Sequence, residues 1–198
     1  AKMYRVKFKA PDGTEVHALC RPDDLGKEDQ SVKSPLKGKP WKNSLGMKFV
    51  PVPGTEVLFS IWDTRVQDYA EFLKADGKEV GTPAGPTHPV VNVSWEEAKA
   101  FCKWLTEKEG KEGWLVKGQE YRLPLDKEWS RAVGLGQELG ATPAGKSGQV
   151  TGYPWGKAWP PPKGAGNYAV SLNVDEFDQT SPVGSFKANK FGLYDMGG

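Results

Sequence analysis

Cysteine and histidine are scarce in this sequence. Among its 198 residues there are two cysteines, Cys20 and Cys102, and two histidines, His17 and His88. Lone cysteines so far apart in the sequence are more often unpaired than paired. A disulfide framework is therefore excluded as the main source of stability.

The sequence also lacks long apolar runs and blocks of like charge. Its 27 basic and 25 acidic residues are spread along the chain and give a net charge of +2. Without a block rich in Lys and Arg, neither nucleic acid nor an anionic membrane surface is indicated as a partner. No apolar run approaches the roughly 18 residues that suggest a membrane-spanning helix.

Glycine, proline and tryptophan, in contrast, are plentiful. The chain has 24 Gly, 16 Pro and 8 Trp, while hydrophobic residues make up only 37%. This composition favours a loop-rich domain held by large aromatic side chains over a helical bundle. The length suits one domain, or one domain with a short extension.

Residues 1–42 are predicted to form such an extension. In YRVKFKA, Tyr4, Val6 and Phe8 alternate with basic residues, which is the pattern of a half-buried strand. A PDG turn at 11–13 and the following TEVHALC complete a predicted β-hairpin. The polar segment that follows has no periodicity and indicates a linker or strap, with a domain boundary near residue 42.

Short strands and helices alternate after this boundary, which is typical of an α+β domain. MKFVPVP at 47–53 and EVLFSIW at 56–62 are predicted strands that a Pro-Gly turn separates. A helix capped by Asp63 or Thr64 should follow. The residues expected on its buried face are Val66, Tyr69, Ala70 and Leu73.

The strongest helix signal begins at Ser94. SWEE forms a capping box in which Glu97 stands three residues after the cap. The apolar face expected for this helix comprises Ala98, Phe101, Cys102 and Leu105. Gly110 is expected to end the helix. On this face, Cys102 is interpreted as a small apolar filler rather than a reactive thiol.

A third helix is predicted within 121–136, after a short strand and a proline. Leucine cannot cap a helix, so Asp126 rather than Leu125 is the expected N-cap. From 137 to 190 the sequence has almost no periodicity, and such a stretch inside a compact domain tends to be functional or ion-stabilised. The aromatic residues expected to pin its loops are Trp155, Trp159, Tyr168, Phe177 and Phe186.

Several motifs, read in order, carry a resemblance to a known family. They are NSLGMKFVPVPG, HPVVNVSWEEAKAFCKWL, YRLPLDKEW, YPWG and TSPVGSFKANKFGLYDMGG. With them, residues 43–198 resemble the formylglycine-generating enzyme family, also called the sulfatase-modifying factor family. The family has Y-R-L-P-T where this chain has Leu125 in the last position, and that difference affects a helix cap and not a catalytic group.

The resemblance implies a C-type-lectin-like α+β fold. Such a fold has small antiparallel sheets, two to three helices and extensive loops. Four tryptophans match core positions of the family, namely Trp95, Trp104, Trp129 and Trp155. Four others are freer of that pattern, namely Trp41, Trp62, Trp114 and Trp159.

The resemblance also implies that the fold is incomplete at its C-terminus. In the family, the motif that matches residues 192–198 continues into N-V-W-E-W and then into the copper-binding cysteine pair. Cys102 matches a structural helix cysteine, and His88 matches a position expected to make a structural hydrogen bond. No catalytic or cofactor-binding residue is assigned here, and copper is expected only with a completing C-terminal segment. Without such a segment, the chain is expected to need a partner chain.

A structural Ca²⁺ site is implied in the loops after YPWG. Asn167 and Asp175 match the ligands that bind through side chains, and Tyr168 and Phe177 match those that bind through backbone carbonyls. Such hard oxygen atoms suit Ca²⁺, which takes six to eight of them. The alternative interpretation is that the acidic residues around Asp175 form a solvated turn.

Membership in a family does not determine function. We favour a noncatalytic, calcium-stabilised binding module of a bacterial, extracytoplasmic or secreted protein, whose lectin-like face binds a protein or another ligand. The alternative is a copper- and oxygen-dependent oxidase that matures sulfatases, with its cysteines beyond residue 198. Iron-dependent sulfoxide synthases of the family need three histidines, and this chain has two.

Overall fold

The computed structural model describes residues 4–9, 15–20, 33–79, 81, 84–135, 140, 142–146 and 152–198. The chain divides into a smaller unit, Ala1–Lys33, and a larger unit, Ser34–Gly198. Among the described residues, no helix is both long and apolar enough to cross a membrane.

The smaller unit contains the predicted β-hairpin. Strands β1 (Tyr4–Lys9) and β2 (Glu15–Cys20) pair antiparallel, with Tyr4 opposite Cys20 and Lys9 opposite Glu15. The alternating sequence therefore predicted both strands correctly. The PDG turn at 11–13 and the segment at 21–32 lie outside the described residues.

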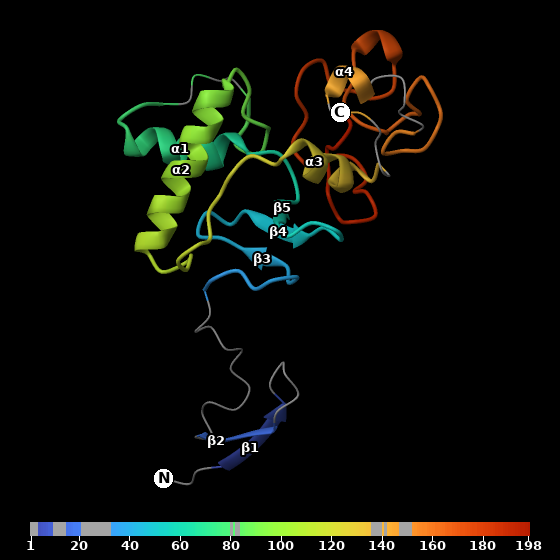
Figure 1. Ribbon diagram of the computed structural model, residues 1–198. Coiled ribbons are helices and arrows are strands. Elements are labelled where there is room, and N and C mark those ends of the chain that lie inside the picture. Colours follow the sequence, from blue (N-terminus) through green and yellow to red (C-terminus); the bar gives the residue numbers. More distant parts are fainter. Residues whose placement is uncertain are drawn as a thin grey trace. The chain divides into compact units, whose positions relative to one another are not determined.

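The larger unit is built on a small antiparallel sheet in the order β3-β4-β5 (Figure 1). Its strands are β3 (Trp41–Lys42), β4 (Lys48–Pro51) and β5 (Leu58–Ser60), the last two being shorter than predicted. Trp41 pairs with Phe49, and Phe49 pairs with Ser60. Residue 42, near which the sequence predicted a boundary, therefore lies in β3 of the larger unit. Residues before β3 also contact this unit, since the side chain of Gln119 donates a hydrogen bond to the Pro35 carbonyl at 2.9 Å.

Within the described ranges, three helices and two short helical turns accompany this sheet, in agreement with the expected α+β class. They are α1 (Val66–Ala75), α2 (Trp95–Lys111), α3 (Asp126–Val133), α4 (Pro143–Lys146) and the 3₁₀ turn η2 (Val170–Leu172). The capping box of α2 is confirmed, because Ser94 Oγ accepts from Glu97 N at 3.2 Å and Glu97 Oε2 accepts from Ser94 N at 2.8 Å. The expected stop at Gly110 is wrong by one residue, since α2 includes Lys111.

The predicted N-caps of α1 and α3 are wrong. The N-cap residues are Arg65 and Leu125, neither of which caps its helix through its own side chain. Instead, a carboxylate three residues later accepts from the cap N–H. Asp68 accepts from Arg65 N at 3.1 Å, and Glu128 accepts from Leu125 N at 2.8 Å. Each of these two helices therefore has one half of a capping box, namely the carboxylate that accepts from the N–H of the cap residue.

Two apolar clusters form the core of the larger unit. The first is Met47, Phe49, Tyr69, Phe101 and Leu105, and the second is Val52, Ala132 and Leu193. Both α2 residues in the first cluster belong to the face that the sequence predicted. Half-buried aromatic rings, including Trp104 and Tyr121, pack around this cluster.

The expectation of four core tryptophans is only partly correct. Trp104 packs against Phe101, and Trp155 is half-buried. Trp95 and Trp129, in contrast, are 61% and 45% exposed. Trp95 is the first residue of α2, where its ring lies 4.1 Å from the ammonium group of Lys99 instead of facing the core.

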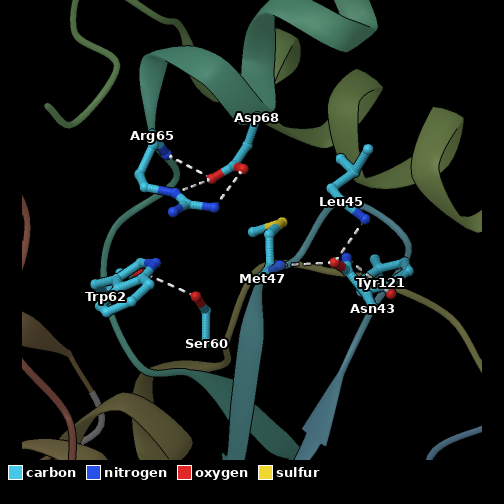
Figure 2. Close-up of polar contacts among 8 residues, drawn as sticks. All are labelled: Asn43, Leu45, Met47, Ser60, Trp62, Arg65, Asp68 and Tyr121. Atoms are coloured by element: carbon cyan, nitrogen blue, oxygen red, sulfur yellow. Dashed lines mark hydrogen bonds and ion pairs between the residues drawn. The ribbon is translucent and has the colours of Figure 1, made fainter. Parts of the chain in front are cut away.

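Two buried polar side chains of the larger unit have specific partners. Asn43 Oδ1 accepts from Leu45 N at 3.0 Å and from Met47 N at 2.9 Å, while its amide donates to Tyr121 Oη at 3.2 Å (Figure 2). Figure 2 also shows the ion pair of Arg65 with the buried Asp68 at the start of α1. Asn43 thus connects the turn between β3 and β4 with the segment after α2, and Asp68 pairs within the first turn of α1.

Candidate functional site

The candidate metal-binding residues lie on one loop within 152–198. Asn167 and Tyr168 precede η2, and Asp175 and Phe177 follow it. Asn173, directly after η2, has a left-handed backbone with φ of 49° and reverses the chain. Hydrogen bonds connect Asp175 with Tyr168 and Phe177 across η2, whereas the Asn167 side chain bonds to Gln179.

Asp175 connects the two sides of this loop. One carboxylate oxygen accepts from Tyr168 N at 2.8 Å, and the other accepts from Phe177 N at 2.9 Å. Asn167 donates its side-chain amide to the Gln179 carbonyl at 2.7 Å, and Gly164 N donates to the Val174 carbonyl at 2.7 Å. The loop is thus ordered by hydrogen bonds that run from side chains to the backbone.

The donor atoms at this loop suit a hard cation by type. A carboxylate oxygen that accepts one N–H keeps a second lone pair. The amide nitrogen of Asn167 donates to Gln179, and its Oδ1 accepts no hydrogen bond from the described residues. Within the described ranges, no group of three or more His, Cys, Asp or Glu side chains could hold a metal. Any Ca²⁺ here depends on one carboxylate, one amide and backbone carbonyls, which are ligand types that Ca²⁺ accepts.

A second polar cluster, which sequence reasoning missed, lies at Asp63 and Asp195. Asp195 Oδ2 accepts from Gly184 N at 2.8 Å, whereas its Oδ1 is buried without a hydrogen-bond partner in the described part of the chain. Burial raises the pKa of Asp195. Burial of its carboxyl group also raises the pKa of Asp63, as does the charge of Asp195, although the residue as a whole is exposed.

The signal for this cluster was present in the sequence. Asp195 interrupts the apolar motif FGLYDM, and Asp63 directly follows the apolar segment EVLFSIW. The indole N–H of Trp62, one residue before Asp63, is also buried and lacks a partner among the described residues. The Trp62 ring packs against Tyr194 with centroids 6.2 Å apart.

His88 has a structural position, as expected. Its Nδ1 lies 2.8 Å from Thr180 Oγ1, and its backbone carbonyl accepts from Val66 N at 2.8 Å. It therefore connects the start of α1 with the loop that leads to the C-terminal motif. This confirms the interpretation of His88 as a hydrogen-bonding residue.

Cys102 is half-buried on α2, so it is less enclosed than the sequence predicted. Burial raises the pKa of its thiol, which favours the protonated form. The residue lines a cavity of about 350 Å³ together with Trp95, Lys99 and Arg122. A thiol with a raised pKa is a poor nucleophile, as the interpretation of a filler requires.

Aromatic rings form a stack beside the candidate loop. Tyr153 and Trp155 are nearly parallel, with centroids 5.0 Å apart and planes at 7°. Trp159 lies 5.6 Å from Tyr153, and the edge of Tyr168 meets Trp155 at 5.6 Å. Trp159 is 62% exposed, so the stack extends from the loop to solvent.

Comparison with known proteins gives a consistent family match. The model of the sulfatase-modifying factor enzyme 1-like domain matches residues 35–198. The formylglycine-generating enzyme of Mus musculus is 31% identical over 136 residues, which cover 64% of this chain and 32% of that protein. The inactive C-alpha-formylglycine-generating enzyme 2 of Bos taurus is 34% identical over 153 residues, which cover 68% and 40%.

A segment of a kinase is similar as well. The serine/threonine-protein kinase pkn1 of Chlamydia caviae is 32% identical over 143 residues, which cover 71% of this chain and 16% of the kinase. The chain thus spans less than half the length of each of these relatives, which come from mammals and bacteria. No solved structure gives a match.

Proposed function

Because the chain belongs to the sulfatase-modifying factor enzyme 1-like domain family, we propose that residues 35–198 act as a noncatalytic binding or interaction module. Cysteine chemistry carries this proposal. A copper(I) site of the kind expected for the oxidases needs two converging soft ligands. Residues 35–198 contain one cysteine, Cys102, whose pKa is raised by burial in α2.

Two relatives support a role without oxidation. A protein named as inactive is as similar to this chain as one named formylglycine-generating enzyme, at 34% and 31% identity. The similarity to a kinase covers only 16% of that protein. Such a match is expected when a domain of this family is attached to an unrelated activity, as function depends on the site rather than the fold.

The alternative is a formylglycine-generating oxidase of longer length, whose cysteine pair lies beyond residue 198. The matched formylglycine-generating enzymes favour it, because their similarity to this chain spans 64% of its residues in the mouse protein. In that case residues 35–198 provide a scaffold for the oxidase. The two candidates differ in whether thiol oxidation occurs at all.

An oxidation assay separates the candidates when the protein is used at its full length, because the alternative places the cysteine pair beyond residue 198. The protein is incubated with a cysteine-containing sulfatase peptide, copper and oxygen, and the peptide mass is followed, with the mouse enzyme as positive control and a reaction without protein as blank. The binding module should form no formylglycine above the blank. Formylglycine formation faster than the blank would overturn the proposal, and a Cys102→Ser variant then shows whether Cys102 takes part.

We also propose that Ca²⁺ stabilises the loop that contains Asn167, Tyr168, Asp175 and Phe177. Support comes from the hard oxygen atoms of these residues and from their placement on both sides of one turn. Ligands this few give weak binding, as in extracellular modules. This consideration makes an extracytoplasmic or secreted location our preferred setting, with a protein or another ligand as partner.

Calorimetry with Ca²⁺ tests the metal site. The wild-type chain should release or absorb heat on binding, and Asp175→Asn should lower the affinity at least about tenfold because it removes the carboxylate charge. Asp178→Asn, an exposed change of the same kind, is the control and should leave the affinity unchanged. Absence of binding to the wild-type chain excludes the calcium site and leaves the assay of oxidation unaffected.

A further inference from the structure

Helix α2 has a second face, distinct from the face that packs into the core. Its residues recur at intervals of four, three and four positions, as on one side of a helix, namely Trp95, Lys99, Cys102 and Thr106. The segment after α2 runs back beside this helix toward α3 (Figure 1). The second face, Lys103 and residues 120–123 line a cavity of about 350 Å³. This volume lies within the range of small-molecule sites.

Hydrogen bonds within the chain hold the walls of this cavity in place. Tyr121 N donates to Thr106 Oγ1 at 2.9 Å, and the Tyr121 hydroxyl donates to the buried Glu109 at 2.5 Å. The Arg122 guanidinium donates twice to the Glu128 carboxylate, at 2.8 and 2.7 Å. Because these contacts need no ligand, little affinity is lost to ordering of the walls when a ligand binds.

Several polar groups that line the cavity already have partners within the chain. The Thr106 hydroxyl, which accepts from Tyr121 N, donates to the Cys102 carbonyl at 2.9 Å. The Lys103 ammonium group lies 3.9 Å from a carboxylate oxygen of Glu107. A polar ligand group placed here would exchange its contacts with water for few new ones, so polar groups on a ligand weaken its binding.

Much of the remaining lining is apolar, and one of its aromatic rings is exposed. Trp95 is 61% exposed, the ammonium group of Lys99 lies 4.1 Å from its ring, and no ring of the described residues stacks on it. Leu123 and the half-buried Cys102 add apolar surface, since burial raises the pKa of the thiol and keeps it uncharged. Lys99 and Glu120 carry opposite charges, so the lining gives no clear advantage to an anion or a cation.

We propose that this cavity binds a small uncharged molecule with a compact aromatic ring system. The ring of the ligand packs against Trp95, Leu123 and the Cys102 side chain. Aromatic rings gain from contact with an indole beyond the burial of area, so Trp95 favours an aromatic ligand over an aliphatic one. The inference rests on the proposed binding role and deepens it, since it assigns a class of ligand to the module.

Ligand-observed NMR with the protein at its full length tests this assignment. Indole, tryptamine and indole-3-acetate share one ring system and differ in charge, while N-acetyltryptophanamide presents the same ring on a peptide backbone. We expect indole to bind at least about fivefold more tightly than each of the other three. Equal binding of a charged probe would contradict the uncharged ligand, and equal binding of N-acetyltryptophanamide would make a protein side chain the occupant. Absence of indole binding would also overturn the site.

Two exposed tryptophans give a matched pair of variants. Trp95→Ala removes one wall of the cavity and should weaken indole binding about fivefold or more. Trp129→Ala removes a ring that is 45% exposed and does not line the cavity, so it should change the affinity less than about twofold. Equal losses in the two variants would mean that indole binds elsewhere.

Alkylation of Cys102 locates the ligand independently. Bound indole should slow the modification of Cys102 by N-ethylmaleimide at least about threefold, because this residue lines the cavity. Cys20, which belongs to the smaller unit, is the internal reference, and mass spectrometry of the two peptides gives both rates. An unchanged rate at Cys102 would overturn the site. The oxidation assay uses none of these probes, so a protein that binds no indole and forms no formylglycine loses the ligand class but keeps the noncatalytic role.

Discussion

Residues 43–135 and residues 152–198 of the larger unit are ordered by different interactions. The first part contains β4, β5 and α1–α3, and the buried residues of α2 are spaced four apart, as on one face of a helix. Phe101 and Leu105, four residues apart on α2, pack directly into the apolar cluster of Met47, Phe49 and Tyr69. Burial of apolar surface by regular elements therefore accounts for its order.

The second part has little regular structure in its described residues beyond η2. Polar side chains contribute to holding its backbone, and both Asp175 and Asn189 form hydrogen bonds with two or more backbone groups. Asn189 is the clearest case, since its amide donates to the Ala132 carbonyl and its Oδ1 accepts from Phe191 N and Leu193 N. Single polar residues there should matter as much as core residues matter elsewhere.

Leu105→Ala should give the largest loss of stability in the first part. Leu105 is fully buried in the first apolar cluster, and its truncation leaves a cavity among aromatic rings. We expect the free energy of unfolding to fall by about 3–5 kcal/mol, measured by urea denaturation. Lys103→Ala, on the exposed face of the same helix, should change it by less than about 0.5 kcal/mol. A loss below about 1 kcal/mol for Leu105→Ala contradicts the assigned core.

Asn189→Ala tests whether one polar side chain orders the second part. It removes three hydrogen bonds and leaves the carbonyl of the fully buried Ala132 without this donor. We expect a loss of about 2–3 kcal/mol in the same urea experiment. The control is Gln179→Ala, because the exposed Gln179 side chain makes no hydrogen bond within the described residues. Equal values for the two variants would remove the contrast between the regions.

The helical part also contains buried polar side chains, and Glu109 is a fully buried example. This fully buried carboxylate accepts from Ser44 N at 2.9 Å and from the hydroxyl of Tyr121 at 2.5 Å. Burial and the contact with Glu109 raise the pKa of Tyr121, so the hydroxyl remains a donor across the neutral range. Hydrogen bonds of buried polar side chains therefore order the helical part as well as the loops.

Tyr121→Phe measures how much the hydrogen bond between Tyr121 and Glu109 contributes to stability. Removal of the hydroxyl leaves one Glu109 oxygen without its donor, and we expect the unfolding free energy to fall by about 1–2 kcal/mol. Tyr69→Phe is a matched control, since the buried Tyr69 hydroxyl makes no hydrogen bond in the described part of the chain. If both variants lose the same amount, ring packing rather than the hydrogen bond is responsible.

The sequence predicted the first part well because its order depends on periodic burial. The face of α2 and the capping box at Ser94 are properties of local sequence. The same holds for the hairpin pattern at Tyr4–Lys9 in the smaller unit. Errors arose where tertiary contacts decide. Trp95 and Trp129 are exposed although aromatic residues usually suggest burial, and the caps of α1 and α3 depend on carboxylates three residues beyond the cap.

The second part was predictable only through the resemblance. No periodicity connects Asp175 with Tyr168 and Phe177, because a left-handed turn at Asn173 brings them together. Likewise, Trp155 and Asp195 are 40 residues apart in the sequence and line one cavity. Local patterns carry no information about such contacts, so composition alone could indicate loops but not what they surround.

Asp63→Asn should have the smallest effect and concerns the junction of the two parts. A carboxyl group with a raised pKa holds its proton more tightly in the folded chain, so stability falls as pH rises from the unfolded pKa through the folded one. At pH values above the folded pKa, the loss of stability from ionising the buried carboxyl group is complete. Removing the charge at position 63 should therefore stabilise the chain at pH 7, by less than about 0.5 kcal/mol because water screens the exposed Asp63. Urea midpoints measured from pH 4 to pH 7 should decline less steeply in the variant than in the wild-type chain, and an unchanged slope would mean that folding does not raise the pKa of Asp63.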